Sequence, residues 1–75
     1  MDLNEFVKAF AAEVEETSID VFTPKTVYQD LEEWDSLRVL SIISMVDELF
    51  GKTITGADLR SLNTIEDLYN FVQSK

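Results

Sequence analysis

The stretch DSLRVLSIISMVDELFG, residues 35–51, decides the fold that this sequence predicts. Its apolar side chains recur at i, i+3, i+4, i+7 and i+11, which is the spacing of one face of an α-helix. They are Val39, Ile42, Ile43, Val46 and Phe50. Asp35 is a candidate N-cap, and Gly51 is a residue that can end a helix with a positive φ. We therefore predict a helix over residues 36–50 with its apolar stripe in the core.

Two other segments show the same helical period. The first is predicted over residues 2–16, with Asp2 as N-cap and Glu5 three positions later, as in a capping box. The second is predicted over residues 65–73. Their apolar faces consist of Leu3, Phe6, Val7, Phe10 and Val14 in the first segment and Ile65, Leu68, Tyr69 and Val72 in the second.

The segment before the central helix has no regular period. Residues 17–35 hold scattered apolar side chains, and Pro24 is a turn signal. A loop this long is unusual in so short a chain, and its apolar residues suggest that it crosses the core. We expect Phe22 and Tyr28 to be the anchors, with a short helical turn near residues 27–31.

After the central helix, a linker leads to a short helix expected over residues 56–60. Asn63 or Thr64 is then expected to cap the last helix. No segment alternates apolar and polar residues as a strand would. The predicted fold is all-α: a small four-helix bundle of three main helices plus one short helix, in a single domain over residues 1–75.

The composition argues against several classes of function. The 75 residues include no cysteine and no histidine, which excludes disulfides, thiolate metal sites and a Ser–His triad. The carboxylates lack the spacing of a known metal site, so we expect none. A net charge of −9, from 15 acidic and 6 basic residues, argues against nucleic acid or an anionic membrane and favours basic partners. The N-terminus lacks a signal-peptide pattern and no apolar run approaches a membrane span, so we expect a cytoplasmic protein.

Ser36 raises the question of function, because it stands where an acidic loop meets the central helix. As a catalytic nucleophile it is weak: only Asp35, Lys25 or Lys52 could assist it, and no GxSxG elbow is present. A small enzyme is therefore a remote interpretation. As a modified residue it is better placed, since the N-terminal end of a helix favours an anion such as a phosphate ester.

The surroundings of Ser36 also suit a modifying enzyme. Residues 23–35 form a loop that would leave the hydroxyl within reach, and Leu37 and Leu40 fall off the core stripe. Exposed apolar side chains beside the serine would give such an enzyme a contact. The other interpretation is that Ser36 only starts a helix. These observations alone do not identify the modifying group.

The sequence resembles the acyl carrier protein family, also called phosphopantetheine-binding carrier proteins. The resemblance lies in Asp35-Ser36-Leu37, the helix RVLSIISMVDELFG over residues 38–51, Ile54 in the following linker, a short helix, and NTIEDLYNFV over residues 63–72. It covers nearly the whole chain in length, helix order and acidity, so the expected bundle is acyl-carrier-like.

The resemblance implies that Ser36 receives a 4′-phosphopantetheine from coenzyme A, with Asp35 and Leu37 as the flanking motif. The thiol of this arm would carry acyl intermediates as thioesters, and the protein itself would be a non-catalytic carrier. Its implied partners are a phosphopantetheinyl transferase and acyl-loading and acyl-processing enzymes such as a ligase, an acyltransferase or a ketosynthase. The pathway would be fatty-acid, polyketide or related specialised biosynthesis, and the carrier a monomer.

Two further sets of residues follow from the resemblance. The expected partner-docking residues are Trp34, Leu37, Arg38, Leu40, Ser41, Ser44, Asp47 and Glu48. In such families the acyl chain can tuck between the helices, and the candidates to line that cavity are Val39, Ile42, Ile43, Val46, Ile54, Leu59 and Leu62.

The chain departs from the fatty-acid members of that family in its charges. Arg38 follows the serine closely, the central helix is negative only at Asp47 and Glu48, and Trp34 stands where a small residue is usual. The acidic residues lie upstream instead, at Glu13, Glu15, Glu16, Asp30, Glu32, Glu33 and Asp35. We interpret this as a carrier with a dedicated set of partners. The alternative is an unmodified acidic helical adaptor that binds a basic protein, in which Ser36 is only a cap.

Overall fold

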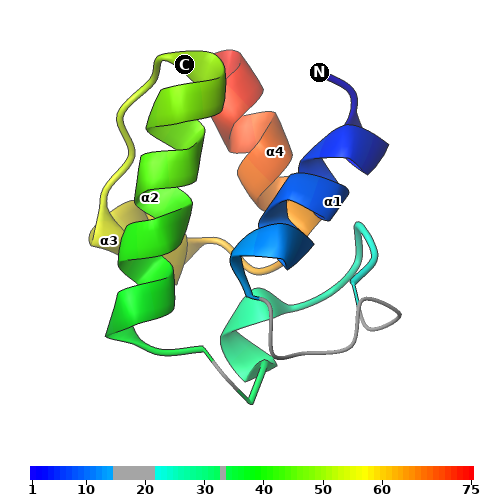
Figure 1. Ribbon diagram of the computed structural model, residues 1–75, viewed down its shortest axis with the longest axis vertical. Helices are drawn as coiled ribbons and strands as arrows, with labels where there is room; N and C mark the ends of the chain where they lie inside the picture. The colour runs from blue at the N-terminus through cyan, green and yellow to red at the C-terminus, as the bar shows by residue number, and fades with distance from the viewer. Residues whose placement is uncertain (15–21, 33) are drawn as a thin grey trace.

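The computed structural model describes residues 1–14, 22–32 and 34–75. Within this part, the elements in chain order are α1 (Leu3–Glu13), the 3-10 turn η2 (Tyr28–Asp30), α2 (Ser36–Phe50), α3 (Gly56–Ser61) and α4 (Ile65–Ser74). Across the same residues the only β pairing is an isolated bridge between Val27 and Thr64. The all-α prediction, with three main helices and one short one, is confirmed (Figure 1).

The first helix is shorter than predicted. Asp2 caps α1 as expected: its carboxylate accepts the N–H of Glu5 at 2.8 Å, and the Glu5 carboxylate accepts the N–H of Asp2 at 3.0 Å. The helix ends at Glu13, however, and Val14 is already a non-helical C-cap with φ −113° and ψ 65°. A continuation to residue 16 would gather acidic side chains at the negative C-terminal end of the helix, where they are unfavourable. The predictions for Glu15, Glu16 and Glu33 concern residues outside the described part.

The ends of α2 are those that the sequence predicted. The carboxylate of Asp35 accepts the N–H of Arg38 at 3.0 Å, which caps the helix. At the other end Gly51 has φ 65°, a left-handed conformation that costs glycine little, and its N–H donates to the carbonyl of Asp47 at 2.9 Å. The caps thus confine α2 to the 15 residues of its apolar pattern.

The last two helices begin with capping boxes. Thr55 and Asp58 form one at α3, and Thr64 and Asp67 form another at α4, so Thr64 and not Asn63 is the cap. Each helix extends one residue further than predicted, to Ser61 and Ser74. Reciprocal caps satisfy backbone N–H groups that a helix leaves free at its start, and they fix where each helix begins.

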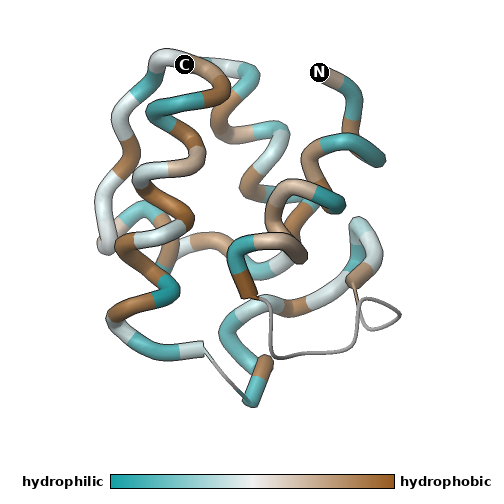
Figure 2. Tube along the Cα trace, in the orientation of Figure 1, coloured by the Kyte–Doolittle hydropathy of each residue, from teal (hydrophilic) through white to brown (hydrophobic). Residues whose placement is uncertain are grey.

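The core lies where α1 packs against α2 and α4, while α3 packs against α2. Figure 2 shows hydrophobic positions recurring along each helix. The fully buried side chains include Phe6, Phe10, Val14, Tyr28, Ile42, Val46, Ile54, Leu59, Ile65, Leu68 and Val72. Phe22 is also buried and its ring lies 6.2 Å from that of Phe10, so the two predicted anchors of the loop are confirmed. None of the described helices is long and apolar enough to cross a membrane.

Candidate functional site

Ser36 is the exposed first residue of α2, the longest helix of the described chain. In Figure 1 this end of α2 lies at the bottom, away from both chain termini. The first backbone N–H groups of a helix have no intrahelical acceptor. Asp35 satisfies one of them, at Arg38, which leaves those of Ser36 and Leu37 at the helix end. Together with the positive end of the helix dipole, this arrangement favours an anion beside the Ser36 hydroxyl.

The outer face of α2 continues from this serine as one stripe. Leu37 and Leu40 are each 61% exposed, and Ser44, Asp47 and Glu48 are exposed further along. The spacing of three and four residues places these five side chains on one face of the helix. The stripe is therefore apolar beside Ser36 and acidic at its far end.

The other three predicted docking residues are less accessible. Arg38 and Ser41 are half-buried. Trp34 is also half-buried: its ring stacks on Phe10 at 5.9 Å and meets Tyr28 at 5.0 Å between ring centroids. These contacts fix the backbone just before Asp35, so Trp34 positions the start of α2. A docking role for its exposed edge stays a prediction.

The seven predicted cavity residues lie on α2, on α3 and on the linkers that flank α3, and all belong to the core or pack against it. Ile42, Val46, Ile54 and Leu59 are fully buried. Val39, Ile43 and Leu62 are partly buried and pack against the core. Because these side chains are part of a packed core, α3 must move away from α2 before a chain could lie between them.

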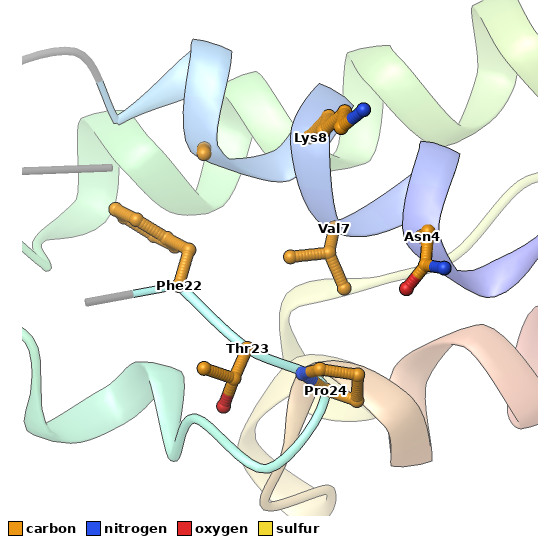
Figure 3. A pocket seen from close by; sticks show the side chains of 7 residues that line it. Asn4, Val7, Lys8, Phe22, Thr23 and Pro24 are labelled. Atoms are coloured by element: carbon orange, nitrogen blue, oxygen red, sulfur yellow. The ribbon is translucent and has the colours of Figure 1, made fainter. Parts of the chain in front are cut away.

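A pocket of about 390 Å³ lies elsewhere, between α1 and residues 22–24. Figure 3 shows Val7 facing it from the helix and Phe22 and Pro24 facing it from the extended segment. Its lining residues are Asn4, Val7, Lys8, Ala11, Phe22, Thr23 and Pro24. None of them belongs to the predicted cavity set, and no sequence pattern indicated this pocket.

The sequence also gave no signal for a group of hydrogen bonds around Tyr28 and Gln29. The Gln29 side-chain amide donates to the carbonyls of Leu59, Arg60 and Leu62 at 3.0–3.2 Å. The buried Tyr28 hydroxyl donates to two of the same carbonyls. Burial, followed by the negative charge of Asp67, raises the pKa of Tyr28 to about 12, so this hydroxyl remains a donor at neutral pH.

Comparison with known proteins gives one family. Residues 5–72 match the family described as "Phosphopantetheine attachment site". The matched range contains Asp35, Ser36 and Leu37 together with all of α2 and α3. No solved structure matches the chain. Domains of this family carry a covalently attached 4′-phosphopantetheine and serve as tethers for biosynthetic enzymes. The chain therefore belongs to the phosphopantetheine attachment site family, that of the acyl carrier proteins and related carrier domains.

Proposed function

We propose that Ser36 holds the phosphopantetheine arm and that the protein delivers acyl groups to a dedicated set of biosynthetic enzymes. The observation that supports Ser36 best is its place as the exposed first residue of α2. The other serines that the structure describes lie within α2 (Ser41 and Ser44) or in the last turn of a helix (Ser61 and Ser74). Of these five, only Ser36 lies at the positive end of a helix dipole.

The residues around Ser36 fit the group. The arm joins its serine through a phosphodiester, and free N–H groups at the start of α2 would favour that negative charge. The Asp35 carboxylate accepts the N–H of Arg38, and this hydrogen bond holds the carboxylate at the N-terminal end of α2. The arm supplies a terminal thiol that holds acyl groups as thioesters, so this chain needs no cysteine of its own.

The charge distribution supports dedicated partners. On the outer face of α2, the part nearest Ser36 is apolar, with Leu37 and Leu40 each 61% exposed. The nearby acidic groups come from the preceding segment, where Asp30, Glu32 and Asp35 are exposed. We infer a transferase and acyl-processing enzymes that offer an apolar contact to α2 and basic residues to the segment before it.

Intact mass spectrometry tests the attachment residue. The parent protein, Ser36→Ala and the matched control Ser44→Ala are incubated with coenzyme A and a broad-specificity phosphopantetheinyl transferase. We expect the parent and Ser44→Ala each to gain one phosphopantetheinyl group and Ser36→Ala to gain none. A gain in Ser36→Ala would show that another residue carries the arm. No gain in a parent that circular dichroism shows to be folded would favour the unmodified adaptor instead.

Acyl loading tests the partner set. Housekeeping fatty-acid enzymes should load the parent poorly, because α2 has a basic residue at Arg38 and no acidic residue before Asp47. Arg38→Asp should improve that loading by removing the positive charge beside Ser36. Efficient loading of the parent, unchanged in Arg38→Asp, would contradict the proposal of dedicated partners.

A further inference from the structure

The short helix α3 has little packing of its own. It is six residues long, and Leu59 is its one buried residue. Helices this short are not stable in isolation. Its N-terminal end is satisfied by the capping box of Thr55 and Asp58, which lies within the helix and its cap. The position of α3 therefore depends on the contacts that hold its C-terminal end to the rest of the protein.

The C-terminal end of α3 is held by a side chain from a distant segment. The last carbonyls of a helix have no intrahelical donor. Here Gln29 donates from its amide nitrogen to the carbonyl of Leu59 at 3.2 Å, to that of Arg60 at 3.2 Å and to that of Leu62 at 3.0 Å. An amide nitrogen has two hydrogens, so the three carbonyls share them. Tyr28 adds its hydroxyl to two of these carbonyls.

The segment that carries Gln29 is fixed independently of α3. The carbonyl of Pro24 accepts the N–H of Glu66 at 2.9 Å, and the carbonyl of Thr26 accepts the N–H of Ile65 at 3.1 Å. Both donors belong to the first turn of α4, which is part of the main core. Gln29 thus extends from a fixed base, and α3 is the side that can be released.

We propose that Gln29 is a positioning residue that latches the C-terminal end of α3, so that its hydrogen bonds set how readily α3 moves away from α2. Release of this latch would uncover Leu59, the buried residue of α3, and the part of α2 that α3 packs against, where Val39 lies beside Gly56. A second step rests on the proposed function: the opening between α3 and α2 admits the acyl chain carried on Ser36.

Hydrogen exchange of the unmodified protein, followed by NMR, tests the latch. Gln29→Glu is nearly the same size but replaces both N–H donors with acceptors that face carbonyl oxygens. We expect the Leu59 amide, which bonds the Thr55 carbonyl, to exchange about tenfold faster, while amides in α1 and α4 are unchanged. Gln29→Lys keeps a donor with a charge suited to a helix C-terminus, and should stay within about twofold of the parent. Gln73→Glu, at an exposed position of α4, is the control with the same change of charge.

Three results would overturn the latch. One is an unchanged Leu59 exchange rate in Gln29→Glu. Another is Leu59 exchange in Gln29→Lys that is as fast as in Gln29→Glu. This would show that any change of the side chain loosens α3, whether or not it donates a hydrogen bond. The third is a rise in the exchange rates of α1 and α4 equal to that of Leu59 in Gln29→Glu. Gln29 would then support the whole bundle and not α3 alone.

The second step is tested on loaded protein. Parent and Gln29→Glu are converted to the holo form, checked by intact mass, and charged with acetyl or octanoyl groups; the thioester is then cleaved with hydroxylamine. A released latch lowers the free energy needed to bury a long acyl chain, and a buried chain protects its thioester from hydroxylamine. The octanoyl thioester should therefore be cleaved about threefold more slowly in Gln29→Glu than in the parent, and the acetyl thioester at the parent rate. Equal octanoyl rates in both proteins would overturn this step. A parent that takes no arm would refute the proposed function, while the exchange experiment on unmodified protein would still decide the latch.

Discussion

Replacing Tyr28 with Phe measures what its buried hydroxyl contributes to the fold. The hydroxyl donates to the carbonyls of Leu59 and Leu62, and the residue is fully buried. Phenylalanine keeps the ring and its aromatic contacts, and Gln29 still donates to both carbonyls. The expected loss is that of one buried hydrogen-bonding group, about 1 kcal/mol in the free energy of unfolding at pH 7. For a domain of this size, Tm should fall by about 5 °C.

The same variant should change how stability depends on alkaline pH. Burial raises the pKa of Tyr28 to about 12 in the folded protein, against a reference pKa of 10.0 for the unfolded chain. Between these values the unfolded chain has lost the proton that the folded protein keeps, so rising pH favours unfolding. The stability present below pH 10 is lost by about 1.4 kcal/mol per pH unit across this window. The advantage of the parent over Tyr28→Phe should therefore vanish near about pH 11 and reverse above it.

Urea denaturation followed by circular dichroism, repeated from pH 7 to pH 11.5, measures both effects. Tyr69→Phe is the matched control, because its hydroxyl donates to the Met1 carbonyl at 2.9 Å in an exposed position. Its stability at pH 7 should stay within about 0.5 kcal/mol of the parent. A parent and a Tyr28→Phe variant that are equally stable at pH 7, or whose difference is constant to pH 11.5, would refute the reasoning.

Three further predictions concern backbone conformation, capping and apolar side chains near Ser36, and their effects on stability are measured by urea denaturation. Gly51→Ala should lower the free energy of unfolding by about 1 kcal/mol, because φ at this position is 65°. Gly56→Ala should raise it by about 0.5 kcal/mol, because the added methyl group meets only side chains, at ordinary contact distances. Asp35→Ala removes the cap and should lower the free energy of unfolding by about 1 kcal/mol. Asp35→Asn keeps an acceptor for the N–H of Arg38 and should lower it little. Equal losses in the two variants would show that the charge of Asp35, and not its cap, stabilises the helix. Trp34→Ala removes the ring contacts with Phe10 and Tyr28 and should lower the free energy of unfolding by about 2 kcal/mol. Leu40→Ala should change it by less than about 0.5 kcal/mol and reduce only loading by partner enzymes. A Trp34→Ala variant as stable as the parent would indicate that Trp34 serves docking and not packing.

The features that the sequence predicted best are those encoded by residues close together in the chain. The period of α2, its Asp35 cap and its Gly51 terminus can all be read within one stretch of 17 residues. The end of α1 was wrong by three residues, because a helix terminus depends on small differences in charge and packing. Gln29 could not be predicted at all, since its partners are backbone carbonyls 30–33 residues away and such bonds leave no pattern in the sequence.

Tyr28 connects the candidate attachment site with the helix that the latch holds. On one side its ring lies 5.0 Å from that of Trp34, two residues before Ser36, and on the other its hydroxyl bonds the end of α3. A displacement of α3 therefore changes the packing of the residue that fixes the start of α2. Because Trp34 is the only tryptophan, its fluorescence would report that displacement without an added label. Acyl chains that separate α3 from α2 should shift the Trp34 emission, and acyl chains too short to reach the core should leave it unchanged.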